Sequence, residues 1–256
     1  MSNLIRLDQH PLADANWRSR CRKELNHNGV LVLHKFLKPK VLQTIIDDGN
    51  ALHPLAYRAD SRHNVYLLEP DDAYNDDHPR NREIPSTKSC ITHDQLPADS
   101  PLRQLHNDTL FKSFLCDVLG EANLYSFADP YSSITFHYAA EGQELGWHFD
   151  NASFAITFLV QKPRAGGEFQ FVRDLRNSET GMTDYDGVGA VLDDRHPVDT
   201  LNIEEGDLVL FRGRDFLHRV TPTRGDVTRM IAVLAYNTRP GVALTESARM
   251  TFYGKL

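Results

Sequence analysis

The 256-residue sequence has few cysteines, no excess of positive charge and no long apolar run. Its three cysteines, Cys21, Cys90 and Cys116, form neither a CxxC pair nor an even set, so the sequence predicts reduced thiols rather than a disulfide framework. A net charge of −7 argues against a nucleic-acid groove, because phosphate contacts require clustered lysine and arginine. Charged residues occur within the first eight positions, and no apolar stretch could cross a membrane. We therefore expect a soluble, cytoplasmic protein with no signal peptide and no nucleic-acid or membrane partner.

The composition is that of an ordinary globular protein, with 41% hydrophobic residues. The length suits one large domain over residues 1–256, and we expect helical support and a lid segment in 1–125 and a β core in 126–256. Apolar spacing predicts helices over about 13–25, from Pro39 onward and over about 101–119, and a short strand over 30–33. Strands are predicted in the second half, over 132–138, 154–160, 169–171, 208–211, 217–221 and 227–236. This pattern favours an α+β fold whose core is a double-stranded β-helix of the jelly-roll or cupin class, with the N-terminal helices packed on one sheet.

Two segments do not fit the regular pattern. Residues 56–97 are rich in Asp, Asn, Arg, His and Pro, which predicts a long polar connection that could serve as a lid over a site. Residues 172–202 are rich in Asp and Gly and are interpreted as an insertion on the barrel. The acidic residues of this insertion are expected to form a solvated loop and not a second metal site.

Two histidines and an aspartate carry the chemistry that the sequence predicts. His148 and Asp150 flank Phe149, and residues i and i+2 of an extended strand project to the same face. Both can therefore bind one metal ion while Phe149 turns away. With the distant His218 they supply two imidazoles and one carboxylate, the facial triad that holds a non-haem Fe(II) and leaves coordination positions open. The sequence thus predicts an iron site with room for a cosubstrate and O2.

Arg229 is the predicted partner of an anionic cosubstrate. The segment 217–236 favours a hairpin in which His218 pairs with Ile231 and Arg229 lies one cross-strand pair away, on the same face. A buried arginine beside a metal needs an anion, and a guanidinium binds a carboxylate bidentately. We expect the distal carboxylate of 2-oxoglutarate, whose other end would chelate the iron. The alternative is a surface cation on an edge strand.

The residues from about 130 to 240 resemble the Fe(II)/2-oxoglutarate-dependent oxygenases that carry an HxD…H…R signature. Beyond the four signature residues, the resemblance rests on segments 166–171, 205–211 and 217–236, which are similar to successive strands of the prolyl-hydroxylase-like subgroup. The length, the motif Gly146-Trp147-His148-Phe149-Asp150 and the tail 251–255 resemble the enzymes that chlorinate or hydroxylate free amino acids, the lysine radical halogenase and hydroxylase group. In that group the halogenases replace the carboxylate ligand with a small residue, whereas this chain keeps Asp150. The resemblance therefore implies hydroxylation of a free amino acid, with L-lysine favoured, O2 consumed, and succinate and CO2 released.

The side chains that would hold cosubstrate and substrate carry weaker signals. Strand parity sends Tyr138 and His137 to opposite faces, and we expect Tyr138 to hydrogen-bond 2-oxoglutarate and His137 to be structural. A free amino acid needs a cation for its carboxylate and acids or amides for its ammonium groups. The candidates are Arg80 or Arg82 for the carboxylate, with Arg82 also favoured by the family resemblance, Asp129 and Asn151 for an ammonium, and Tyr253 as a cover. Loop capping, turn formation or surface exposure is the competing explanation for each.

Two other functions remain open at this stage. One is an oxygenase that acts on a residue of a protein, as prolyl hydroxylases do, although the predicted lid favours a small-molecule amino acid substrate. The other is a jelly-roll binding protein without catalysis, which would be expected to have lost at least one of the four signature residues. A homodimer is compatible with the sequence.

Overall fold

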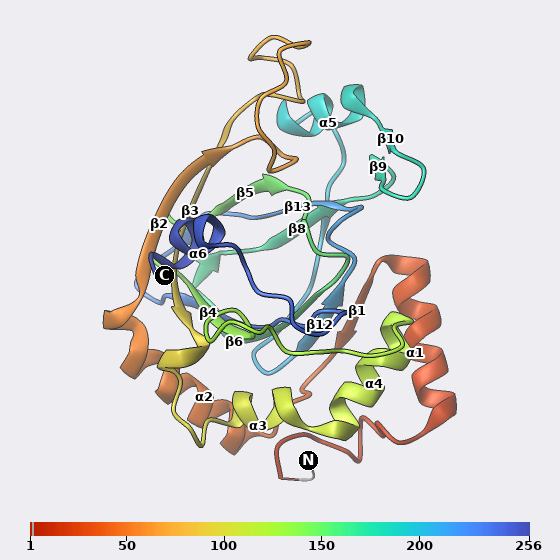
Figure 1. The fold of residues 1–256 in the computed structure, drawn as a ribbon, viewed down its shortest axis with the longest axis vertical. Coiled ribbons are helices and arrows are strands. Elements are labelled where there is room, and N and C mark those ends of the chain that lie inside the picture. Colours follow the sequence, from red (N-terminus) through yellow and green to blue (C-terminus); the bar gives the residue numbers. More distant parts are fainter. Residues whose placement is uncertain (2) are drawn as a thin grey trace.

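The computed structural model describes residue 1 and residues 3–256, in which a helical layer covers one face of a long, curled antiparallel sheet (Figure 1). The helices begin and end at residues suited to these places. Asp14 accepts a hydrogen bond from the Trp17 amide at the start of the first helix, and Gly29 ends it with a φ of 72°. The α-helices are α1 (Ala15–Asn28), α2 (Pro39–Leu52), α3 (Pro101–Asn107), α4 (Thr109–Leu119), α5 (Tyr185–Leu192) and α6 (Glu246–Tyr253), and the short 3-10 helices are η1 (His53–Leu55) and η2 (His93–Gln95).

The helix predicted over 101–119 is two helices. The break falls at Asp108, which adopts an extended conformation and accepts a hydrogen bond from the Phe111 amide. A side chain that caps the amides of a new helix competes with continuation of the old one. Apolar spacing alone runs through such a break, which is why the sequence pattern merged α3 with α4.

The sheet orders its strands as β1-β12-β6-β15-β4-β3-β5-β13-β8-β11, with β2 paired to β3. The strands of this sheet are β1 (Val30–Leu33), β2 (Tyr57–His63), β3 (Ile84–Thr92), β4 (Ile134–Ala139), β5 (Leu145–His148), β6 (Ala155–Gln161), β8 (Phe169–Val172), β11 (Asp199–Thr200), β12 (Leu208–Phe211), β13 (Leu217–Val220) and β15 (Arg229–Leu234). Two separate pairs are β9 (Arg176–Asn177) with β10 (Met182–Thr183), and β7 (Ala165–Gly166) with β14 (Thr223–Arg224).

The long sheet curls into two halves joined through β3. The first half runs from β1 to β3, and the second from β5 to β11; a single pair, Ser86 with Leu145, connects β3 to β5. Side chains from both halves line one cavity, so the halves face each other. The predicted mixed helix and sheet class is confirmed, and the strand content of the second half agrees with the prediction.

The predicted hairpin between the strands around His218 and Arg229 is wrong. β13 pairs with β5 and β8, whereas β15 pairs with β4 and β6. Ile231, the expected partner of His218, pairs with His137 instead. Both edges of each strand are already occupied, so the chain between them crosses from one half of the sheet to the other. A turn signal in the sequence cannot distinguish a hairpin from such a crossing.

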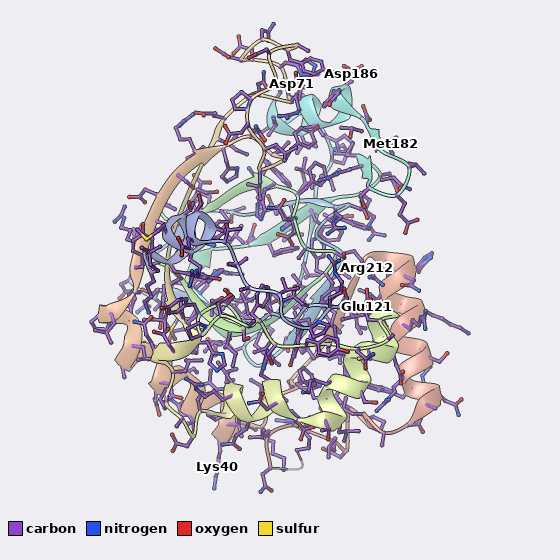
Figure 2. The ribbon with its side chains drawn as sticks, viewed as in Figure 1. Lys40, Asp71, Glu121, Met182, Asp186 and Arg212 are labelled. Carbon is purple, nitrogen blue, oxygen red and sulfur yellow. The ribbon has the colours of Figure 1, made fainter. Side chains whose placement is uncertain are left out.

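The polar segment 56–97 contains two paired strands, where one long connection was predicted. β2 pairs along its whole length with β3, and the loop 64–83 between them is irregular. The loop packs against α5: Arg82 forms a 2.5 Å ion pair with Asp193, just after this helix. Asp71 of the loop and Asp186 of α5 lie at the same end of the molecule, and Lys40 lies at the opposite end (Figure 2).

Three apolar clusters hold these layers together. The largest lies between the first half of the sheet and the helices, and includes the fully buried Phe36, Phe111, Phe114, Phe136 and Phe158. A second packs β5, β13 and β8 against α5, and a third, which includes Val209 and Phe211, lies between the two halves of the sheet. Burying one such side chain contributes about 1.5–3 kcal/mol. The helical layer therefore stabilises the first half and leaves the space between the halves for a site.

Candidate active site

The structure brings His148, Asp150 and His218 together at the edge of the space between the two halves. His148 ends β5 and is the direct cross-strand partner of His218 on β13, with ring centroids 4.2 Å apart. The Nε2 atoms of both histidines lie 3.7 Å from Oδ1 of Asp150. Among residues 1 and 3–256, this is the one group of three or more His, Cys, Asp or Glu residues whose donor atoms converge.

Both histidines are fixed in the form that binds a metal. Nδ1 of His148 lies 2.8 Å from the Gly146 carbonyl, and Nδ1 of His218 lies 2.9 Å from the Phe216 carbonyl. A carbonyl only accepts, so each Nδ1 carries the proton and each Nε2 presents its lone pair to the site. Burial holds the pKa of His148 well below its ordinary value, with His218 as a further cause, which favours the neutral imidazole that a metal requires.

The loop before β13 holds Asp150 in position. The Phe149 amide donates to the Val65 carbonyl at 2.8 Å and the Asp150 amide to the Gly213 carbonyl at 2.9 Å, while the fully buried Phe149 ring packs in the second apolar cluster. Phe149 thus turns away from the site, as predicted. A Cβ on Gly213 would collide with the Asp150 carboxylate, so this glycine leaves the room that the carboxylate occupies.

A deep cavity of about 210 Å³ extends from the triad to Arg229 between the halves of the sheet. Its walls are mainly apolar and include Phe169, Leu201, Val209 and Phe211. Arg229 is 4% exposed. Its Nε donates to the Gly167 carbonyl at 3.0 Å, and its Nη2 has no partner within residues 1 and 3–256. Burial lowers the pKa of Arg229 to about 10, so the guanidinium is still a cation at neutral pH.

These residues fit an iron ion and a dicarboxylate. The donor set has the composition of the Fe(II) facial triad, and the side chains around it leave open space on the cavity side. The unpaired Nη2 of a buried arginine indicates an anion that is not part of the chain, because an uncompensated buried charge is costly. His148, Asp150 and His218 would hold the metal, and Arg229 would bind the far carboxylate.

A family comparison decides what kind of chain carries this site. Residues 13–250 match the model of the family described as Halogenase D. The chain belongs to the Halogenase D family. No curated protein matches it in sequence.

Solved structures share the fold of this Halogenase D family member at low identity. A 2OG-Fe(II) oxygenase family oxidoreductase from Burkholderia pseudomallei is 16% identical with a TM-score of 0.54, over 88% of this chain and 92% of that one. A prolyl-4-hydroxylase from Pseudomonas putida is 12% identical with a TM-score of 0.53, over 85% and 98%. The epimerase SnoN, in complex with Fe3+ and alpha ketoglutarate, is 12% identical with a TM-score of 0.58, over 91% and 97%. The chain therefore shares its fold with iron/2-oxoglutarate oxygenases, and it carries a His–Asp–His cluster whose residues fit an iron ion.

Tyr138 lies outside the deep cavity, which corrects its predicted contact with 2-oxoglutarate. Its ring points from β4 into the helical layer, where the hydroxyl donates to the Gly49 carbonyl at 2.8 Å. His137 faces the cavity instead, together with Thr157 of β6. Strand parity had separated the two faces correctly, but the sequence does not show which face meets the helices. The sequence signal that could have shown this is the apolar stripe of α2, which is buried against the face of β4 that carries Tyr138.

The predicted substrate residues are dispersed. Arg82 binds Asp193 and the Leu192 carbonyl at the α5 end of the molecule. Asp129 accepts hydrogen bonds from the amides of residues 131, 132 and 244 and so fixes a turn. Asn151 is exposed, and its main-chain carbonyl accepts a hydrogen bond from Arg214. Neither Arg82 nor Asp129 lines the cavities beside the triad, because each is already engaged within the chain.

An outer cavity of about 440 Å³ lies on the other side of His148. β2 supplies much of its lining, and α6 covers it with Thr251 and Phe252 while the adjacent Tyr253 lies outside the lining. Figure 1 shows α6 lying against β2 and β3. Lys88, Leu145 and His148 line both the deep and the outer cavity, so these residues mark the boundary between them.

Among the helices of the described residues, none is long and apolar enough for a membrane span.

Proposed function

We propose that the chain is an Fe(II)- and 2-oxoglutarate-dependent hydroxylase that acts on an unactivated C–H bond of a free amino acid, with L-lysine as the first candidate. The observation that carries the hydroxylase assignment is Asp150. Its carboxylate lies 3.7 Å from both histidine Nε2 atoms, where it takes up the coordination position that a halide would need. When bound, Fe(II), 2-oxoglutarate and O2 supply the oxidant for the C–H bond, and 2-oxoglutarate leaves as succinate and CO2.

The residues of the chain contribute positioning and the exclusion of water. The two Nδ1 hydrogen bonds orient the histidines, and Gly213 leaves room for Asp150. Arg229 binds and orients the far carboxylate of the cosubstrate from the opposite half of the sheet. The apolar walls of the deep cavity keep bulk water from the reacting centre, so that the C–H bond held nearest the metal is the one that reacts.

The outer cavity supports a free amino acid as the substrate. It is lined by Lys88 and by the exposed ion pair of Arg58 and Asp60, 3.0 Å apart, so charges of both signs border the space for a zwitterion. Phe252 on α6 closes it on one side, which disfavours an extended peptide groove. L-lysine in particular is supported by the resemblance of the motif around Trp147 and of the C-terminal tail to lysine-modifying enzymes.

Halogenation is the second candidate, because the family that the chain belongs to is described as a halogenase family. The two reactions differ in the atom delivered to the substrate carbon. They can be separated by incubating the protein with Fe(II), 2-oxoglutarate, O2 and chloride and a panel of free amino acids, followed by mass spectrometry. We expect products that gain one oxygen and no chlorine.

A chlorinated product from the unchanged protein would overturn the hydroxylase assignment. Succinate formation that no free amino acid stimulates would overturn the substrate class and favour a protein substrate. Under anaerobic conditions, absence of the charge-transfer absorption band of an Fe(II)–2-oxoglutarate chelate would overturn the enzyme proposal itself. Asp150→Gly is the matched variant, because it frees one coordination position while both histidines remain.

A further inference from the structure

We propose that Lys88, at the boundary between the deep and the outer cavity, binds the carboxylate of the substrate and holds the reacting end of the substrate against the metal centre. The inference rests on the proposed function and adds the residue that positions the substrate. It replaces Arg82, the sequence-based candidate, whose guanidinium already binds Asp193 and the Leu192 carbonyl far from the boundary.

The strand β3 aims Lys88 at the boundary. Alternate residues of a strand share a face, so Ser86, Lys88 and Cys90 point the same way. The hydroxyl of Ser86 accepts a hydrogen bond from the Gly146 amide at 2.9 Å, and the thiol of Cys90 donates to the Phe252 carbonyl of α6 at 3.1 Å. Lys88 therefore projects between the metal-binding strand β5 on one side and the cover of the outer cavity on the other.

The ammonium of Lys88 has no partner among the described residues. Burial lowers the pKa of Lys88, while Cys90 and Asp150 act in the opposite direction. The side chain is only half-buried, but it lies against the mainly apolar walls of the deep cavity, where an anion would stabilise a cation. Asp150 is the one carboxylate that lines the deep cavity, and the metal would claim it. Asp60, the carboxylate in the lining of the outer cavity, already pairs with Arg58 at 3.0 Å, so the anion for Lys88 is expected to come with a ligand.

The cosubstrate has no carboxylate left for Lys88. One carboxylate of 2-oxoglutarate would lie on the metal, and the other would meet Arg229 at the far end of the deep cavity. The outer cavity, which Lys88 shares with His148, is the space that remains for the substrate. A substrate carboxylate at Lys88 would lie beside the metal centre, with the rest of the molecule extending toward the rim of the outer cavity, where the ion pair of Arg58 and Asp60 lies.

The test compares a carboxylate with its amide on two versions of the protein. Unchanged protein and Lys88→Met are loaded anaerobically with Fe(II) and 2-oxoglutarate, and L-lysine or L-lysinamide is titrated while the charge-transfer band is followed. In the unchanged protein we expect L-lysine to bind at least about 30-fold more tightly than L-lysinamide, the effect of pairing a buried charge. Lys88→Met should abolish this preference and should change the affinity for 2-oxoglutarate less than about threefold.

Two further variants separate binding from folding. Lys88→Arg keeps the charge and should retain most of the preference for the carboxylate. Lys162→Met removes an exposed lysine that pairs with Glu204 and lies outside both cavities beside the triad, and it should behave like the unchanged protein. Lys88→Met should be at least as stable to heat as the unchanged protein, because it removes an unpaired charge.

Three outcomes would overturn the proposal, and they can be distinguished from one another. If Lys88→Met keeps the preference for L-lysine over L-lysinamide, Lys88 does not bind the carboxylate. If the same variant weakens 2-oxoglutarate as strongly as Arg229→Met does, Lys88 belongs to the cosubstrate site. If no free amino acid perturbs the band of the unchanged protein, the proposed substrate class fails and the assignment of Lys88 fails with it, while the metal centre stands.

Discussion

The deep and the outer cavity meet at His148 but are built in different ways. The deep cavity lies between the two halves of the sheet, and its functional side chains come from paired strands: His148 and His218 are cross-strand partners, and Arg229 begins the central strand β15. The outer cavity is lined by an edge strand, β2, and by the last helix, α6.

This difference assigns separate tasks to the two regions. A strand with both edges paired cannot shift without breaking its ladder, so the triad and Arg229 are held in fixed relative positions. β2 and α6 are held by fewer neighbours, and their residues can change at a smaller cost. We expect changes in the deep cavity to affect metal and cosubstrate, and changes in the outer cavity to affect the substrate alone.

The largest effect is expected from His148→Ala or His218→Ala. Either change removes one of two imidazoles that are fixed toward the metal, so turnover should fall to background and the charge-transfer band should be lost. His27→Ala, on the exposed last turn of α1, is the control and should leave both readouts unchanged. Retained activity in either triad variant would mean that the metal lies elsewhere.

Arg229→Met is expected to have the second-largest effect, a loss of affinity for the cosubstrate. Removing one partner of a buried charge pair costs about 2–5 kcal/mol, so 2-oxoglutarate should bind at least about 30-fold more weakly. Titration of the charge-transfer band measures this affinity directly. Arg164→Met, which removes an exposed arginine paired with Asp226, is the control. An equal loss in both variants would contradict a specific role for Arg229.

Gly213→Ala should produce a smaller loss of metal affinity. The added methyl group would collide with the carboxylate of Asp150 and displace it, and disturbing the support of a ligand typically costs about 10–100-fold in affinity. Competition with a metal chelator reports the change. Gly189→Ala in α5 adds the same methyl group against the tip of Pro79 and should have no effect on the metal. Full metal affinity in Gly213→Ala would show that the position of the Asp150 carboxylate does not depend on the space beside Gly213.

The smallest effect is expected from Phe252→Ala in the outer cavity. The Phe252 side chain is 41% exposed, so it contributes partial contact, and its loss should raise the KM for the amino acid about two- to fivefold. The affinity for 2-oxoglutarate should not change. Met250→Ala, on the same helix with 45% exposure, lies outside the cavity lining and is the matched control. A loss of 2-oxoglutarate affinity in Phe252→Ala would contradict the assignment of separate tasks to the two cavities.

Most elements of the fold could be predicted from the sequence, whereas their pairing could not. Apolar spacing located α1, α2 and seven strands of the sheet, because period and capping are local properties. The segment 56–97 was predicted as a polar loop because β2 alternates charged and polar residues on an exposed edge, a composition that is rare in strands. The hairpin around residue 224 failed for a different reason: partner choice depends on which strand edges are free.

The triad was predicted from the sequence alone, because the spacing of His148 and Asp150 around Phe149 and the residue types are fixed by covalent order, and the structure brings both residues to His218. The sequence also predicted that Arg229 shares a site with His218, but through a hairpin that does not form. In the structure the two residues line one cavity from opposite halves of the sheet. Only the tertiary structure decided that Tyr138 faces the helices and that Arg82 is already paired. The same holds for Lys88, which lines both cavities together with His148. Such facts depend on which distant elements pack together, and packing of distant elements is not encoded in any local stretch of the chain.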